Sequence, residues 1–192
     1  MDEFRRNTLF QLIGYLKSLD SDVICLQEVL YYQFKLMKVM LNMDGVFGMH
    51  VNNKKMKFGI CILSKNKINN SSHILLSSDK EQRGLLSVES KETIIINTHL
   101  GLNKEERQNQ ISEILDFIKL QSEKVIICGD FNEENINLGS YIDVAQYMKK
   151  SSNPTFKTSR IDYVFVSATI KIKSYYVDRV YYSDHFPILV EI

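Results

Sequence analysis

The chain has no long hydrophobic run. No uncharged stretch in its 192 residues is long enough to span a bilayer, and residues 1–6 contain no apolar segment of signal-peptide length. Cysteine is also scarce: the three cysteines each lie in an apolar run and have no disulfide-like spacing. We therefore expect an intracellular, cytoplasmic protein in a reducing compartment, without a membrane segment.

The chain has almost no net charge. Its 24 Lys and Arg residues face 23 Asp and Glu residues, which leaves a formal charge of +1. Such a balance provides no long-range basic field, so a polyanionic partner must be bound by local contacts. Repeats, linkers and low-complexity tracts are also absent. With 44% hydrophobic residues, this length suits a single domain over residues 1–192.

The apolar pattern changes along the chain. Helical spacing is present in residues 5–19, 30–42, 104–120 and, weakly, 141–149. Short apolar runs typical of strands occupy residues 23–26, 46–51, 58–63, 73–76, 85–89, 93–98, 125–128, 161–166, 172–180 and 187–192. This order favours an α/β (α+β) fold, in which sheets pack face to face with helices on the outside.

Five short polar segments follow or end these apolar runs. They are residues 26–28, 97–100, 129–132, 160–163 and 183–185, which carry Glu28, His99, Asp130, Asn132, Asp162, Asp184 and His185. Strands hold such residues rigidly while their polar ends reach solvent or a ligand. Together the segments indicate a metal-assisted phosphoester site.

Each segment also has a structural interpretation. Asp130 can activate a water molecule while the Asn132 amide donates to a phosphoryl oxygen, but the same Gly-Asp-x-Asn pattern suits an Asx turn. Glu28 ends a buried strand, where a carboxylate is costly unless water, a cation or a hydrogen bond receives it; it also suits an exposed turn or a helix start. His99 is either a phosphate contact or an ordinary strand-end histidine.

Asp184 and His185 are neighbours in a segment that precedes a strand. Adjacent side chains diverge in extended backbone, so one can face a metal and the other the substrate. A carboxylate bonded to one imidazole nitrogen would fix the tautomer of His185, and Asp162 is the residue that suits this role.

In this order, the segments resemble the endonuclease/exonuclease/phosphatase family, the metal-dependent phosphoesterases related to pancreatic deoxyribonuclease. The resemblance runs from Arg5 to Ile192 and extends to residues 59–64, Arg83-Gly84 and residues 106–110. It implies a four-layer sandwich of two mainly antiparallel β-sheets with helices outside. The site would lie at the edge where strand ends of both sheets converge.

The resemblance also implies roles. Glu28 would ligate a divalent cation, Mg²⁺ or alternatively Mn²⁺, with Asp184 in the same metal site. Asp130 would position and activate the attacking water, and Asn132 would hold a phosphate oxygen. His185, oriented by Asp162, would stabilise the charged phosphoryl group with help from His99. Magnesium prefers carboxylate oxygens and neutralises charge on phosphorus-bound oxygens, which agrees with these roles.

One feature departs from the family. Its members begin with a strand that carries an Asn near the metal and phosphate, whereas this sequence starts at Met1, directly before the first helix, and is N-terminally short by comparison. Loss of an inner strand exposes backbone groups of its neighbours. An upstream segment is missing, another element substitutes, or the protein is impaired.

The leading hypothesis for function is a metal-dependent phosphodiesterase or nuclease. The phosphoester substrate would be nucleic acid, contacted locally by lysines at positions 54, 55, 57, 65, 67, 149 and 150, although such clusters are commonly solvated surface. One alternative is a phosphatase or phospholipase-like hydrolase of inositol or sphingolipid headgroups, which short loops without a membrane-binding segment disfavour. The other is a non-catalytic binding protein.

Overall fold

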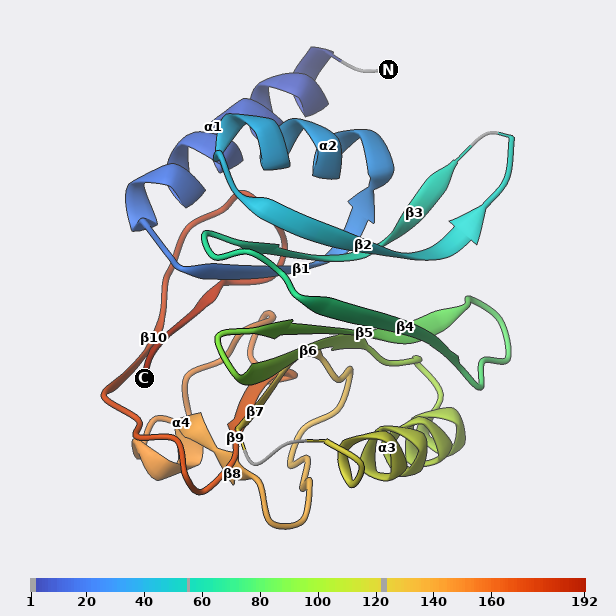
Figure 1. Ribbon diagram of the computed structural model, residues 1–192, viewed down its shortest axis with the longest axis vertical. Coiled ribbons are helices and arrows are strands. Elements are labelled where there is room, and N and C mark those ends of the chain that lie inside the picture. Colours follow the sequence, from blue (N-terminus) through green and yellow to red (C-terminus); the bar gives the residue numbers. More distant parts are fainter. Residues whose placement is uncertain (1–2, 55, 122–123) are drawn as a thin grey trace.

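β-sheets lie face to face in the middle of the molecule, with helices on both outer sides (Figure 1). The computed structural model describes residues 3–54, 56–121 and 124–192. Helices α1 (Glu3–Leu19) and α2 (Tyr31–Met40) cover one side, and α3 (Lys104–Ile118) and α4 (Val144–Tyr147) cover the other. The predicted α/β fold class, with sheets inside and helices outside, is confirmed.

The larger sheet, sheet B, has six strands in the order β4-β5-β6-β7-β9-β8. These are β4 (Asn70–Leu76), β5 (Arg83–Ser90), β6 (Thr93–His99), β7 (Val125–Asp130), β9 (Asp162–Val166) and β8 (Ile142–Asp143). Among the described strands, only β6 and β7 pair in parallel, and α3 forms the crossover between them. Ile114 and Ile118 of α3 pack with Ile96 and Ile127 of the sheet, so the crossover helix buries its apolar side there.

The smaller sheet, sheet A, contains β1 (Val23–Leu30), β3 (Lys57–Ser64) and β2 (Asp44–Asn52), in the order β1-β3-β2. A separate pair is formed by β10 (Ser174–Val177) and β11 (Ile188–Glu191). Ile60 and Ile62 of β3 pack with Leu86 and Val88 of β5, which joins the inner faces of the two sheets. The described strands therefore form two sheets packed face to face and one separate pair.

A groove of about 1020 Å³ lies between β1 and β11, both of which line it. Leu12 and Leu16 of α1 and Ile126 and Val164 of sheet B also line the groove, so it is largely apolar. Among the described strands, β1 pairs only with β3, and β11 pairs only with β10. Each of these two strands therefore has one edge without a strand partner in the described part of the chain.

Three predicted boundaries were wrong. β1 continues to Leu30 through a bulge between Leu26 and Val29, instead of ending at residue 26. The helix expected over residues 141–149 is strand β8 followed by the four-residue α4, because the Asp143 side chain accepts the Ala145 and Gln146 N–H groups and caps the helix there. The expected strand 172–180 is restricted to β10. Among the described helices, none is long and apolar enough to cross a membrane.

Candidate active site

Three neighbouring strands of sheet B bring the predicted residues His99, Asp130 and Asp162 together. In the strand registers, His99 of β6 lies beside Asp130 of β7, and Asp130 lies beside Asp162 of β9. The close approach of β7 to β6 requires Gly129, since a Cβ atom there would lie 2.0 Å from the carbonyl oxygen of Thr98. The sheet therefore places an imidazole and two carboxylates in one row.

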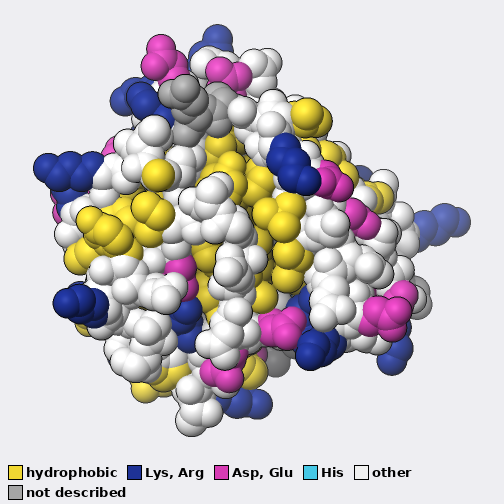
Figure 2. Space-filling model, turned by 90° about the horizontal axis from the view of Figure 1, so that it is seen from below, with side chains coloured by type: hydrophobic (Ala, Val, Ile, Leu, Met, Phe, Trp, Pro, Cys, Tyr) yellow, Lys and Arg dark blue, Asp and Glu magenta, His cyan; other side chains and the backbone are white. Residues whose placement is uncertain are grey.

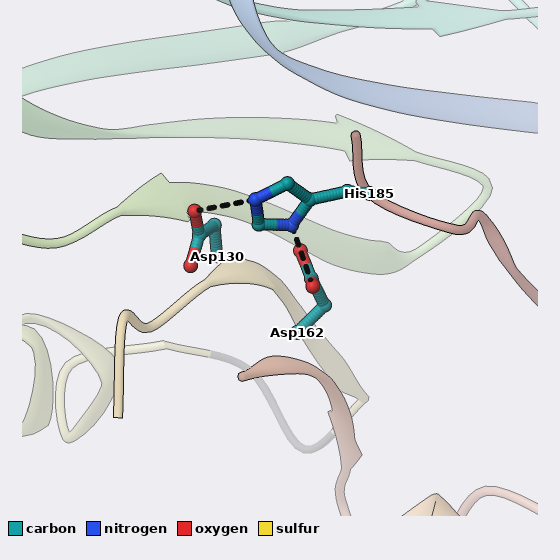
Figure 3. Close-up of side chains that lie close together, drawn as sticks. All are labelled: Asp130, Asp162 and His185. Carbon is teal, nitrogen blue, oxygen red and sulfur yellow. Dashed lines mark hydrogen bonds and ion pairs between the residues drawn. The ribbon is translucent and has the colours of Figure 1, made fainter. Parts of the chain in front are cut away.

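His185 joins this row from the loop between β10 and β11. The backbone N–H of Phe186 donates to the Thr155 carbonyl oxygen at 2.7 Å, and the Phe156 ring lies 4.6 Å from the His185 ring. His185 Nδ1 lies 2.9 Å from an oxygen of Asp162, as Figure 3 shows. An ionised carboxylate only accepts, so Nδ1 carries the proton and Nε2 is directed toward Asp130.

Asp130 lies between two imidazoles and its carboxylate is buried. Its Oδ2 atom is 3.4 Å from Nε2 of His99 and 3.9 Å from Nε2 of His185. Its Oδ1 atom accepts the backbone N–H of Asn132 at 2.8 Å. Burial and the charge of Asp162 raise the pKa of Asp130 from 3.8 to about 6. A carboxylate that titrates near neutral pH suits a general base.

The two imidazoles differ in charge. Burial lowers the pKa of His185, but the hydrogen bond and charge of Asp162, helped by Asp130 and Asp184, outweigh burial and raise that pKa above 6.5. Burial, together with the charges of Arg83 and His50, lowers the pKa of His99 to about 3. His99 is therefore neutral near pH 7, whereas His185 is readily protonated.

Asn132 lies in a turn that the Asp130 side chain closes. An Asx turn was one of the two interpretations of the Gly-Asp-x-Asn pattern. The Asn132 backbone has a φ of 50°, which is unusual for a residue other than glycine, and its N–H bonds to the Asp130 side chain. Its amide nitrogen donates to the Leu100 carbonyl oxygen at 2.9 Å. The turn fixes the Asp130 carboxylate, and phosphate binding by Asn132 stays a prediction.

Glu28 lies on the wall of the groove, outside the row formed by sheet B. It sits on the bulge of β1 with a φ of 55°, and its exposed carboxylate makes no hydrogen bond or ion pair with any residue that the structure describes. Backbone strain of this kind is typical of functional sites. The neighbouring Gln27 amide donates to the Asn97 Oδ1 atom at 2.6 Å, and the buried Asn97 amide donates to the Leu26 carbonyl oxygen at 3.0 Å. These bonds hold the bulge against sheet B.

The residues present fit a divalent cation. Glu28 offers an uncommitted carboxylate, and the Asp162 charge raises the Asp130 pKa, a repulsion that a nearby cation would relieve. Asp184 is exposed, and its Oδ1 atom accepts a hydrogen bond from Ser183 Oγ at 3.1 Å. Within the described ranges, ligand atoms close to within 4.8 Å belong to Asp130, Asp162 and His185. The structure does not bring Glu28 or Asp184 into that set.

Sequence analysis missed two residues that position the site. The buried Thr155 Oγ1 atom accepts the backbone N–H groups of Ile161 and Asp162, at 3.2 and 3.1 Å, and so holds the start of β9. Phe156 contacts the His185 ring across the loop. Their only sequence signal was the Asn-Pro turn directly before them, which gives no indication that Phe156 contacts a ring 29 residues away.

A model of the "Endonuclease/Exonuclease/phosphatase family" matches residues 5–185. The chain belongs to this family. No curated protein matches the sequence. Among solved structures, the chain is similar to TDP2 from D. rerio in complex with single-strand DNA product, with 20% identity, 96% and 91% of the two chains covered and a TM-score of 0.76.

Two further structures of this fold come from other organisms. A mannosyl-6-phosphatase from Bacteroides thetaiotaomicron is 20% identical, with 97% of this chain and 91% of that chain covered and a TM-score of 0.76. The human Nocturnin catalytic domain with bound sulfate is 19% identical, with 100% and 88% covered and a TM-score of 0.74. At such identities, the structures establish the fold alone. Membership of the endonuclease/exonuclease/phosphatase family supports a hydrolase of phosphoester bonds.

Proposed function

We propose that the chain is a divalent-metal-dependent phosphodiesterase that cleaves nucleic acid. The observation that carries this proposal is the row of Asp130, His185 and Asp162. A buried carboxylate with a pKa of about 6 lies 3.9 Å from an imidazole whose other nitrogen is bonded to a second carboxylate. The row thus combines a base with a group that can carry positive charge beside it.

Asp130 acts as the base in this mechanism. The Asn132 N–H group occupies its Oδ1 atom, which leaves Oδ2 to accept the proton of a water molecule as the water attacks phosphorus. The bond between phosphorus and the leaving oxygen breaks, and the leaving oxygen takes up a proton from solvent. Burial keeps this carboxylate basic enough to accept that proton near neutral pH.

The two histidines donate hydrogen bonds to the phosphoryl oxygens. Asp162 bonds to Nδ1 of His185 and stabilises its positive charge, so Nε2–H can donate to a phosphoryl oxygen whose negative charge grows during attack. The neutral His99 donates from Nε2 beside it. Removal of one such donor from an enzyme typically costs about 10²- to 10³-fold in turnover.

Glu28, together with Asp184, would hold the cation. When bound, Mg²⁺, or Mn²⁺ in its place, would neutralise charge on the phosphorus-bound oxygens. Glu28 and His185 both line the groove, which is where we place the substrate.

Nucleic acid is the proposed substrate because the fold is shared with a TDP2 that holds single-strand DNA product. Of the seven lysines predicted to contact phosphate, Lys54, Lys57, Lys67 and Lys149 are exposed. Lys65 is instead paired with Asp20, and Lys150 donates to the Tyr175 carbonyl oxygen; Lys55 lies outside the described residues. Four of the seven lysines are therefore available for phosphate contacts.

A phosphatase acting on a phosphomonoester is the second candidate, because the mannosyl-6-phosphatase shares the fold equally well. Hydrolysis of inositol or sphingolipid headgroups belongs to the same alternative. A binding protein without turnover is the third, because β1 and β11 have no strand between them in the described residues.

A substrate panel tests the proposal. The purified chain would be given labelled single- and double-stranded oligonucleotides, inositol phosphates, a sugar 6-phosphate and sphingomyelin vesicles, each with Mg²⁺, Mn²⁺ or EDTA. We expect EDTA-sensitive cleavage of an oligonucleotide that is lost in Glu28→Gln. Phosphate release from monoesters alone would favour the phosphatase, whereas saturable oligonucleotide binding without cleavage would favour the binding protein.

A further inference from the structure

Arg83 is a buried arginine held firmly at the start of β5. Its side chain is only 4% exposed. Its backbone N–H donates to Ser78 Oγ at 2.9 Å, and its carbonyl oxygen accepts from the Gln82 amide at 2.8 Å. These bonds fix the backbone from which the side chain enters the site.

The charge of Arg83 is not balanced by a buried partner. Its Nη1 atom lies 3.4 Å from an oxygen of Glu81, whose side chain is 48% exposed, and its Nε atom has no hydrogen-bond partner among the described residues. Burial of a guanidinium group with so little compensation is costly. The remaining contact is a hydrogen bond of 3.1 Å between Nη1 and His99 Nδ1.

This contact determines which nitrogen of His99 carries a proton. A guanidinium group only donates, so Nδ1 must accept and must be free of a proton. A neutral imidazole has a single N–H group, which is then on Nε2, and Nε2 lies 3.4 Å from Asp130 Oδ2. Other ionisable side chains that act on His99 are His50 of β2 and His185 of the β10–β11 loop, and both further disfavour a second proton.

We propose that Arg83 is a positioning residue that keeps Nδ1 of His99 free of a proton, so that its one N–H group faces Asp130 and the reacting phosphoryl group. The catalytic part of this inference rests on the proposed function. Without Arg83, no donor would hold Nδ1 in its acceptor form, and the single proton of the neutral ring could lie on Nδ1 instead. Nε2 would then have no N–H group to offer to a phosphoryl oxygen.

The ring nitrogens of His99 test the inference directly. In ¹⁵N-histidine-labelled protein near pH 7, the wild type should give an unprotonated Nδ1 and a protonated Nε2. Arg83→Met should place a proton on Nδ1, and Arg83→Lys, which keeps a charged donor, should restore the wild-type state. Arg107→Met is the matched control, because Arg107 is also buried but bonds to Glu133, and it should leave His99 unchanged.

Kinetics on the cleaved substrate provide the second readout. Arg83→Met should lower kcat at least about tenfold with little change in KM, and Arg83→Lys should recover part of that loss. A proton on Nδ1 in the wild type would overturn the inference, as would an Arg83→Met variant with lower kcat and an unchanged His99. If Arg83→Met fails to fold, the ¹⁵N spectra of the wild type and of Arg83→Lys test the inference instead. A wild type with the expected spectrum but no turnover would reject the proposed function alone.

Discussion

The Asp162 carboxylate acts on both the proposed base, Asp130, and the proposed hydrogen-bond donor to the phosphoryl oxygen, His185. Its charge raises the pKa of Asp130, and its hydrogen bond and charge raise the pKa of His185. Activity should require ionised Asp130 and protonated His185, which predicts a bell-shaped pH profile. Its acidic limb should lie near pH 6, and its basic limb above pH 6.5.

Asp162→Asn should move both limbs to lower pH, because the replacement lowers both pKa values. The measurement is kcat/KM against pH at saturating Mg²⁺ for the wild type and the variant, with circular dichroism to confirm folding. Unmoved limbs, or limbs that move in opposite directions, would contradict this account of the site.

We expect Asp130 to lower the stability of the fold. Its folded pKa of about 6 exceeds the ordinary 3.8, so the ionised form is disfavoured in the folded state. The cost is absent below pH 3.8, grows as pH rises and is complete above about pH 6. At about 1.4 kcal/mol per pKa unit, it amounts to roughly 1–3 kcal/mol.

Asp130→Asn should therefore lower turnover by about 10²- to 10⁴-fold and yet raise the free energy of unfolding at pH 8, with no gain at pH 4. Urea unfolding without divalent cations measures the gain. Asp143→Asn is the control, because Asp143 is bonded by Arg160 at 2.7 and 3.1 Å and its loss should destabilise the fold. Equal destabilisation by both substitutions would refute the predicted cost.

At residue scale, His99, Asp130 and Asp162 were predictable because each ends or begins an apolar run, where a strand presents its polar side chain. Their adjacency follows from the register of three neighbouring strands. The contact between Phe156 and His185 was not predictable, because it depends on how a loop folds back across the end of sheet B. The role of Arg83 depends in the same way on its contact with His99, sixteen residues away.

Strand β7 reaches the site only because of Gly129. This residue has a φ of 144°, and a Cβ atom would lie 2.0 Å from the Thr98 carbonyl oxygen. Gly129→Ala should therefore destabilise the protein by about 3 kcal/mol or more and misplace Asp130. Gly139 also has a positive φ, of 65°, but nothing lies within 4 Å of its Cβ position, so Gly139→Ala should cost only about 1 kcal/mol. Thermal unfolding compares the two; equal losses would show that the close approach of β7 is unimportant.

At the scale of elements, the apolar pattern predicted that strands exist better than it predicted where they end. The bulge that carries β1 past residue 26 depends on a positive φ at Glu28, which no propensity favours in a glutamate. Bonds from Asn97 of β6 to the carbonyl oxygens of Leu26 and Cys61 hold this region of sheet A against sheet B. Such support between elements cannot be read from a local pattern.

Charges of both signs are mixed on one face of the molecule. Figure 2 shows one face, on the side of α3 and α4, where basic and acidic side chains surround a central band of hydrophobic ones. This distribution agrees with the net charge of +1. A nucleic acid would therefore be held by a few local contacts and not by a broad basic surface.

Binding of an oligonucleotide to the Glu28→Gln variant should depend only weakly on salt. Four available lysines, Lys54, Lys57, Lys67 and Lys149, would give a slope of log K against log salt no steeper than about −3 for a single strand. Lys67→Ala should reduce the slope by about 0.7. Fluorescence anisotropy at several salt concentrations measures this, and a slope several times steeper would require a basic surface that the described residues do not provide.

The family was predictable from the whole chain because five weak motifs occur in a fixed order. The arrangement of the strands at the groove was less predictable from the sequence. The groove that β1 and β11 line, and that reaches His185, is seen only in the structure.

Hydrolysis of a simple activated phosphodiester, bis(p-nitrophenyl) phosphate, tests the central claim most directly. Its leaving group departs without help from a particular group of the protein. Wild type, Asp130→Asn and His185→Ala would be compared with His73→Ala, a histidine outside the site, each with Mg²⁺ and with EDTA. We expect Mg²⁺-dependent turnover that falls at least about a hundredfold in the first two variants and persists in His73→Ala. Turnover that survives in Asp130→Asn and His185→Ala, or that ignores EDTA, would contradict the proposed active site.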